Sequence, residues 1–198
     1  MLLKPDRLKS FSDSVIVVAV VLLVYNLATL ATTDPDAFQP EVFFATLVAY
    51  VNSFIVVFLF WVTFTILLDY IKQLDDVVIS LSLIFLILVT LTPVANVAFH
   101  QDKTTRSLVF ISFVEISAGL LLILILFYVG KGKVLHNPDS RGTLLGFCVI
   151  PSVYAISLIV SIFNFTIASI IPLSIVPLFV ILRLRARQIR PNENNSGI

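Results

Sequence analysis

Two acidic residues stand out in this sequence because long apolar stretches follow or surround them. Asp13 completes the segment Arg7-Leu8-Lys9-Ser10-Phe11-Ser12-Asp13, and an apolar stretch begins directly after it. Glu115 lies deep inside another apolar stretch. An unpaired acid is costly in such surroundings, so each carboxyl is expected to be neutral or paired with a neighbour. The chemistry open to these positions is ion binding, proton binding or the bracing of one helix against another.

The other reactive side chains are too scattered to form a catalytic or metal site. His100 and His136 fall in expected loops far apart in the sequence, whereas a metal site needs several ligands close together. Cys148 is the single cysteine, and we expect it to be a small buried side chain. An enzyme would need such groups in a cluster. We therefore expect no enzymatic activity, no cofactor and no bound metal.

The composition indicates a membrane protein. Of 198 residues, 59% are hydrophobic and 13% are charged, and the mean hydropathy is +1.06. Soluble proteins are about 45–50% apolar and about 25% charged, and a soluble domain of this size could not bury so much apolar surface. The formal net charge of +1 provides no broad basic field for nucleic acid. We expect contact with membrane lipids and no nucleic-acid partner.

The apolar stretches predict an all-α, polytopic fold, because about 20 apolar residues cross a bilayer as a helix. The last apolar run, 143–182, is too long for one crossing, so we expect it to reverse at Ser161-Ile162-Phe163-Asn164. Residues 1–190 then form one domain with six spans, and residues 191–198 form a disordered cytoplasmic tail. The expected spans are about 12–31, 42–68, 77–99, 107–130, 143–163 and 165–182.

The basic residues predict that both termini are cytoplasmic. In that orientation only Lys103 and Arg106 among the 13 basic residues lie outside the cell, and the other eleven lie inside. Positive charge collects on the cytoplasmic side of membrane proteins. Residues 32–41 and 100–106 are then external, and the chain is a multi-pass protein of the cell membrane.

The residues before the first span resemble a known signature. The pattern Arg7-x-x-x-Phe11-Ser12-Asp13, followed by an apolar helix, resembles that of the transmembrane protein 175 family, which are potassium-selective channels of endolysosomes with shorter bacterial and archaeal relatives. Phe60-Trp61, the stretch 82–93 and the turn 161–164 are similar to further parts of the family's pattern. The resemblance implies a homotetramer of six-helix subunits, in which four copies of the first helix line a central pore for potassium ions.

The resemblance also assigns roles within the first helix. The family's narrow position lies five residues after the motif aspartate, which is Val18 here. Leu22 and Tyr25 would form further layers of a constriction made of large side chains rather than backbone carbonyls. The residues implied to brace the first helix against its neighbours are Arg7, Phe11, Ser12 and Asp13.

Helical geometry supports a common face for the three constriction layers. At about 100° per residue, Val18, Leu22 and Tyr25 lie within about 60° of one another. Asp13 lies about 140° from Val18, which suits contact with neighbouring helices better than contact with permeating ions. Further candidates for lining the pore are Ser14, Val21 and Thr29.

Three positions depart from the family's pattern. Ser14 stands where the family often has glycine or alanine. Val21 stands where many members have threonine, so a possible hydroxyl layer of the pore is absent. Thr63-Phe64-Thr65 stands where bacterial relatives often have Asn-His-His, so the polar network beside the motif must differ.

Other interpretations remain open on the residues alone. Glu115 suits a proton- or ion-coupled secondary transporter, although transporters usually have broken helices near the midplane. It equally suits a protonated structural role with Asn52, Ser53 or Ser112 as partner. The chain could also be a structural membrane subunit. Asp13 could simply favour a helix start, where negative charge is stabilised.

Overall fold

Helices account for nearly all of the described chain. The computed structural model describes residues 4–32, 40–69, 71, 74–129, 138–175, 177–178 and 181. The five long helices are α1 (Pro5–Thr32), α2 (Pro40–Asp69), α3 (Asp76–Asp102), α4 (Thr105–Val129) and α5 (Pro138–Ser161). A short helix, α6 (Phe165–Ile170), continues directly into the 3-10 helix η3 (Ile171–Ser174).

Four of the helices are long and apolar enough to cross a membrane. The qualifying stretches are Pro5–Tyr25, Thr46–Asp69, Asp76–Phe99 and Thr105–Val129. The apolar parts of the last two segments, Cys148–Ser161 and Phe165–Ser174, are shorter. The expected all-α membrane fold is therefore confirmed, with four long apolar helices in the described residues.

The first and last predicted spans differ from the helices observed. Helix α1 begins at Pro5 rather than near residue 12, so the whole motif is helical. Proline suits a first helical turn, where its missing N–H and fixed φ cost nothing. Within the predicted span 165–182, α6 ends at Ile170, Pro172 lies in the tighter turns of η3, and helical residues recur at 175, 177–178 and 181. Proline removes a helical donor and clashes with the preceding turn, which explains the interruption.

Short polar caps set the connections between consecutive helices. The side chain of Asp75 accepts a hydrogen bond of 2.8 Å from the Val78 N–H and so starts α3. Lys103 ends that helix in a left-handed conformation, with φ 47°. After α5 the chain reverses over 162–164, where a break was expected, and the Asn164 side chain caps α6 by accepting from the Ile167 N–H at 3.2 Å.

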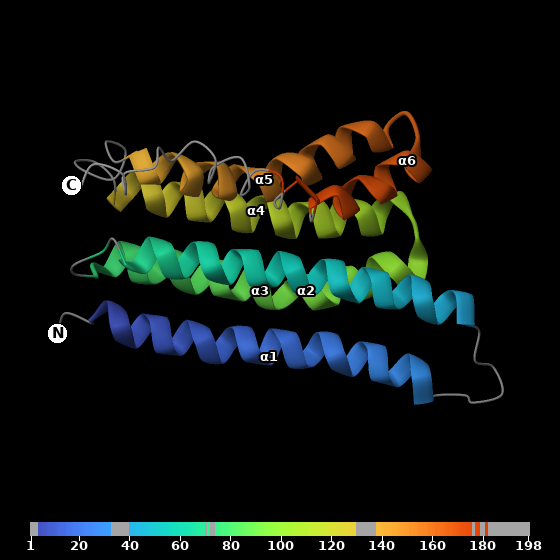
Figure 1. Cartoon of the computed structure of the whole chain (residues 1–198), viewed down its shortest axis with the longest axis horizontal. Helices are drawn as coiled ribbons and strands as arrows, with labels where there is room; N and C mark the ends of the chain where they lie inside the picture. Colours follow the sequence, from blue (N-terminus) through green and yellow to red (C-terminus); the bar gives the residue numbers. More distant parts are fainter. Residues whose placement is uncertain are drawn as a thin grey trace, which may run out of the picture.

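The helices form a layered bundle with α1 at one edge (Figure 1). Helix α1 packs on α2 and α3, α3 packs on α4, and α4 packs on α5, which in turn carries α6 and η3. Phe85 of α3 contacts two aromatic rings of α2, with centroids 5.8 Å from Phe60 and 4.9 Å from Phe64. All three rings are buried, so they join the two central helices. Among the described helices, this arrangement leaves one side of α1 without a neighbour.

Helices α4 and α5 approach each other closely at Gly119. A Cβ atom at this position would lie 2.7 Å from Cγ of Pro151, a buried residue inside α5. Small residues let membrane helices pack closely, because van der Waals contact replaces the hydrophobic effect there. Gly119 therefore sets the distance between these two helices.

The start of α3 is tied to the end of α4 by one polar contact. The hydroxyl of Tyr128 donates to the carboxylate of Asp75 at 2.7 Å. The Val78 N–H and this hydroxyl both stabilise the charged form, so the pKa of Asp75 lies below its ordinary value. The contact fixes the relative position of the two helices at the end of the bundle where the chain starts (Figure 1).

Candidate functional site

Helix α1 has one buried face, which holds it against α2 and α3. Its buried residues recur every three or four positions, as expected for one stripe of a helix. They are Leu8, Ser12, Ile16, Ala19 and Leu23. Ala19 is fully buried and small, so the backbones of α1 and its neighbours lie close together at mid-helix.

The opposite face of α1 is exposed, although it is strongly apolar. Val18 is 56% exposed, Leu22 is 40% exposed and Tyr25 is 64% exposed. Val21, at 58%, and Ser14 are exposed as well. The backbone of Thr29 continues the helix, but its side chain lies outside the described residues. The structure thus places the described candidate pore residues on the side of α1 that no other described helix covers.

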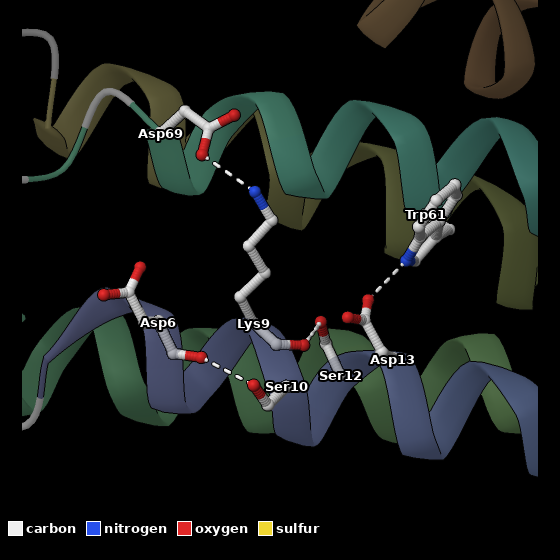
Figure 2. A network of polar contacts seen from close by, with 7 residues as sticks. All are labelled: Asp6, Lys9, Ser10, Ser12, Asp13, Trp61 and Asp69. Atoms are coloured by element: carbon white, nitrogen blue, oxygen red, sulfur yellow. Dashed lines mark hydrogen bonds and ion pairs between the residues drawn. The ribbon is translucent and has the colours of Figure 1, made fainter.

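Asp13 points away from this exposed face toward α2 (Figure 2). Its carboxylate accepts a hydrogen bond of 2.7 Å from Nε1 of Trp61. The partner is thus an indole of the neighbouring helix and not Arg7, whose side chain is exposed and forms no ion pair with a described residue. Because an indole N–H only donates, this contact satisfies one carboxylate oxygen without adding a charge.

A second contact joins the same two helices one turn closer to the chain start. Nζ of Lys9 lies 3.0 Å from a carboxylate oxygen of Asp69, the last residue of α2 (Figure 2). The two side chains are 35% and 63% exposed. Exposed ion pairs contribute only about 0–1 kcal/mol to stability, so this one orients α1 more than it stabilises it.

Phe11, half exposed, lies on the uncovered side of α1.

The hydroxyl groups of the motif region bond to their own helix. Ser12, fully buried, donates to the carbonyl oxygen of Lys9 at 2.7 Å. Ser10 donates to the carbonyl of Asp6 at 3.0 Å, and Ser14 donates to that of Ser10 at 3.1 Å. Ser12 therefore lets α1 lie close to its neighbours without leaving an unpaired hydroxyl donor.

The segment Thr63-Phe64-Thr65 supplies no polar bracing between described residues. Thr63 donates to the carbonyl of Leu59 in its own helix at 2.6 Å, and Phe64 is buried against Phe85. The buried hydroxyl of Thr65 has no hydrogen-bond partner among the described residues. The contacts of Trp61 and Asp69 with α1 are therefore the polar bracing observed between these two helices.

Glu115 is fully buried in α4, away from α1. Neither of its carboxyl oxygens forms a hydrogen bond with a described residue. The Thr92 hydroxyl of α3 faces the carboxyl without meeting hydrogen-bond geometry, and Tyr154 of α5 lies near enough for electrostatic interaction. Of the partners expected from the sequence, Ser112 shares its face of α4, whereas Ser53 bonds to the carbonyl of Ala49.

Several contacts were not anticipated from the sequence. Asp69 as partner of Lys9, and Thr92 and Tyr154 beside Glu115, join residues on different helices. In the sequence, these residues stood out only as polar positions within or beside an apolar stretch. That observation does not identify the residue with which each one interacts. Cys148 is exposed and not buried, because it lies on a side of α5 that no described helix covers.

Comparison with known proteins gives two matches. Residues 7–93 match the model of the family described as "Endosomal/lysosomal potassium channel TMEM175", and this region covers α1, α2 and most of α3. The fold matches the crystal structure of a lysosomal potassium-selective channel TMEM175 homolog from Chamaesiphon minutus, with a TM-score of 0.72 and 15% sequence identity. That match covers 92% of this chain and 97% of the other. No curated protein sequence matches the chain.

The matched region contains both the exposed face of α1 and the Asp13–Trp61 contact that braces it. The shared fold extends over nearly the whole chain. Residues 7–93 are thus similar to the TMEM175 family of potassium channels, and the chain as a whole shares the fold of a solved TMEM175 homolog.

Proposed function

We propose that this chain forms a potassium-selective channel in which four copies of α1 surround the ion pathway. The single observation that carries the proposal is the two-faced character of α1: one face is packed and braced, and the other is apolar and uncovered. The family match includes this helix, and the family's description names a potassium channel. The full subunit would be a six-span unit in which the region after α4 supplies the last two crossings.

In this proposal the constriction is formed by side chains of α1. Val18 would form a ring around the axis, and Leu22 would extend the dry zone by one turn. Such rings offer no hydrogen-bond partner to an ion or its water, so a narrow apolar passage tends to dewet and an ion must lose hydration to cross it. Tyr25 would form a wetter layer, and Ser14 and Thr29 would lie toward the two ends.

The motif residues would set the angle of α1 and would not touch ions. Asp13 is held by Trp61 on the side of α1 that faces α2, and Ser12 is buried against the bundle. Arg7 and Phe11 are exposed on the isolated subunit, where a neighbouring copy could contact them. A change in this network would therefore act on assembly or opening before it acted on ion choice.

The proposed orientation has both termini in the cytoplasm. Lys4, Arg7 and Lys9 lie at one end of the bundle. At the other end, Lys103 lies in the turn between α3 and α4, and Arg106 lies in the first turn of α4 (Figure 1). The basic excess of the whole sequence favours the first end as cytoplasmic.

The proposal is tested by ion flux through the purified protein in liposomes or planar bilayers. We expect Val18→Asn or Leu22→Asn to raise conductance and to weaken discrimination between potassium and sodium, because an amide stabilises water in the constriction. Reversal potentials in mixed potassium and sodium measure the discrimination. Tyr25→Phe should change both quantities less.

A matched control is Leu124→Asn, which changes an equally apolar residue of α4 that is 51% exposed. It should leave flux and reversal potential unchanged if the pathway runs along α1. If both asparagine variants of α1 give the flux and reversal potential of the unmodified protein, α1 does not line the pathway and the proposal fails.

A further inference from the structure

Several buried oxygen atoms around Glu115 form no hydrogen bond with a described residue. Both carboxyl oxygens of Glu115, the hydroxyl of Ser112 and the hydroxyl of Thr92 are buried and lack hydrogen-bond partners among the described residues. Ser112 precedes Glu115 by one helical turn, and Thr92 faces the carboxyl from α3. Unpaired buried polar groups are costly, so a cluster of them indicates a site rather than a packing accident.

The two hydroxyls differ from most other helical hydroxyls of this chain. Ser53, Thr63, Ser80 and Thr90 each donate to a carbonyl oxygen of their own helix, three or four residues earlier. That local bond is the usual way for a serine or threonine to be satisfied inside a helix. Because Ser112 and Thr92 do not form it, their hydroxyls remain available to the carboxyl of Glu115.

A cavity of about 90 Å³ lies toward the turn between α3 and α4, and its lining includes Tyr154 but not Glu115, Ser112 or Thr92. Its polar lining includes Asn96 of α3, Asn52 of α2 and Tyr154 of α5. Asn96 is one helical turn from Thr92, and Tyr154 lies near Glu115. The oxygen of Asn52 has no hydrogen-bond partner among the described residues. This volume and lining suit water molecules, which need two to four polar partners each.

The opposite side of Glu115 is sealed by apolar side chains. Moving along the helices away from the cavity, the next buried residues are Val89 and Phe85 of α3, Ala118 and Leu122 of α4, and Ile150 of α5. No polar group bridges this layer in the described residues. Among the described residues, the polar side chains near Glu115 therefore lie toward the α3–α4 turn and not toward the other end of the bundle.

We propose that Glu115, with Thr92, Ser112 and Tyr154, is a proton-binding site that exchanges protons through the cavity with the side of the membrane where the α3–α4 turn lies. With a proton, rotation of these side chains would let the carboxyl donate to one hydroxyl of the cluster and accept from the other, which would satisfy all three groups. Without it, a charge is left among α3, α4 and α5, where Tyr154 is the titratable group facing it and no described cation offers compensation.

The consequence is a pH-sensitive device in the layer behind the proposed pore helix. Loss of the proton would draw water from the cavity into the space between α3 and α4, and α3 packs directly on α1. The sealed far side makes the site a one-sided sensor and not a route across the membrane. The site lies away from α1, so its existence does not depend on the channel function proposed above.

Carbodiimide labelling tests whether this carboxyl carries a proton. Dicyclohexylcarbodiimide adds to a protonated carboxyl: the proton moves to a nitrogen, the oxygen bonds to the central carbon, and rearrangement leaves a stable N-acylurea. We expect the full-length protein in detergent to gain one adduct that peptide mapping places at Glu115. The adduct should decrease as the pH rises, and Glu115→Gln should lose it. Suppression of labelling by sodium at constant pH would show a metal-cation site and overturn the proposal.

Infrared spectroscopy provides a second readout that needs no reagent to enter the bundle. The difference between the unmodified protein and Glu115→Gln should contain the carbonyl band of a protonated carboxyl, which disappears at high pH. Absence of this band at every pH overturns the proposal, whatever the labelling result.

The proposed access route is tested by the rate at which the same band shifts in heavy water. Asn96→Leu replaces a polar wall of the cavity with an apolar one of similar size and should slow the shift several-fold. The control is Ser82→Ala, which removes a buried hydroxyl of α3 beyond the apolar seal and should leave the rate unchanged. Equal rates in both variants and in the unmodified protein would rule out the cavity as the route.

Discussion

The contact between Asp13 and Trp61 shows how one hydrogen bond can determine which way a helix faces. The two residues are 48 positions apart, and the bond lies on the side of α1 opposite to its uncovered stripe. A hydrogen bond from an N–H to a carboxylate is charge-assisted, and such bonds are stronger than those between two neutral groups. Rotation of α1 about its axis would break this bond and also expose Ser12, so the two residues together fix the orientation of the helix.

A double-mutant cycle on this pair measures the bracing directly. Trp61→Phe keeps an aromatic ring and removes the donor, whereas Asp13→Leu removes the acceptor. We expect each variant to lower the thermal stability of the detergent-solubilised protein, with a coupling energy of about 1 kcal/mol, because the carboxylate is half-buried and water competes for it. Asp13→Asn keeps an acceptor oxygen and should have the smaller effect. Additive effects of Trp61→Phe and Asp13→Leu would mean that the bond contributes nothing to stability.

At the scale of the helices, the close approach of α4 and α5 depends on one residue without a side chain. A methyl group at Gly119 would overlap the ring of Pro151, and a proline ring cannot move aside as a flexible side chain would. Overfilling of a packed interface typically costs about 1–3 kcal/mol. We expect Gly119→Ala to lower the unfolding free energy in detergent by that amount. Leu120→Ala, at a neighbouring position that is 55% exposed, should have little effect and serves as control.

An unchanged stability of Gly119→Ala would contradict this account, since it would mean that α4 and α5 separate without cost. The same interface holds Tyr154 beside Glu115 from the α5 side. A change in the distance between the two helices would therefore also be visible in the infrared band of the carboxyl.

The helices differ in how far sequence could predict them. The four long spans follow from apolar length, and the turn at 162–164 follows from a run too long for one crossing and a polar asparagine in it. The short α6 ends just before Pro172, which lies in the first turn of η3, and a proline in this apolar run predicts a kink there. The partners of Glu115 depend on the rotation of three helices about their axes, and hydropathy carries no information on rotation. The face of α1 was implied by the family resemblance, and the angular spacing of residues in a helix agreed with it.

At the scale of the whole molecule, orientation in the membrane decides which end of the bundle faces the cytoplasm and which faces the outside of the cell. Asp76 and Asp102 begin and end the same helix, α3, and both are exposed. In a Cys148→Ser background, which removes the exposed native thiol, each aspartate is replaced singly by cysteine. We expect an impermeant thiol reagent to label position 102 in intact cells and position 76 only after the membrane is opened. The reverse pattern would place both termini outside the cytoplasm.

Because α1 is attached to its own subunit by one face only, the structure also predicts how an assembly of unmodified and altered chains would conduct. In the proposed tetramer the uncovered stripes of four chains meet around one axis, so every subunit contributes to a single shared passage. A chain altered at Leu22 would then change the passage of each assembly that it enters, including those in which it is outnumbered. Mixtures of two kinds of chain should therefore not conduct as the average of the two pure proteins, and a minority of altered chains would dominate the behaviour of a membrane.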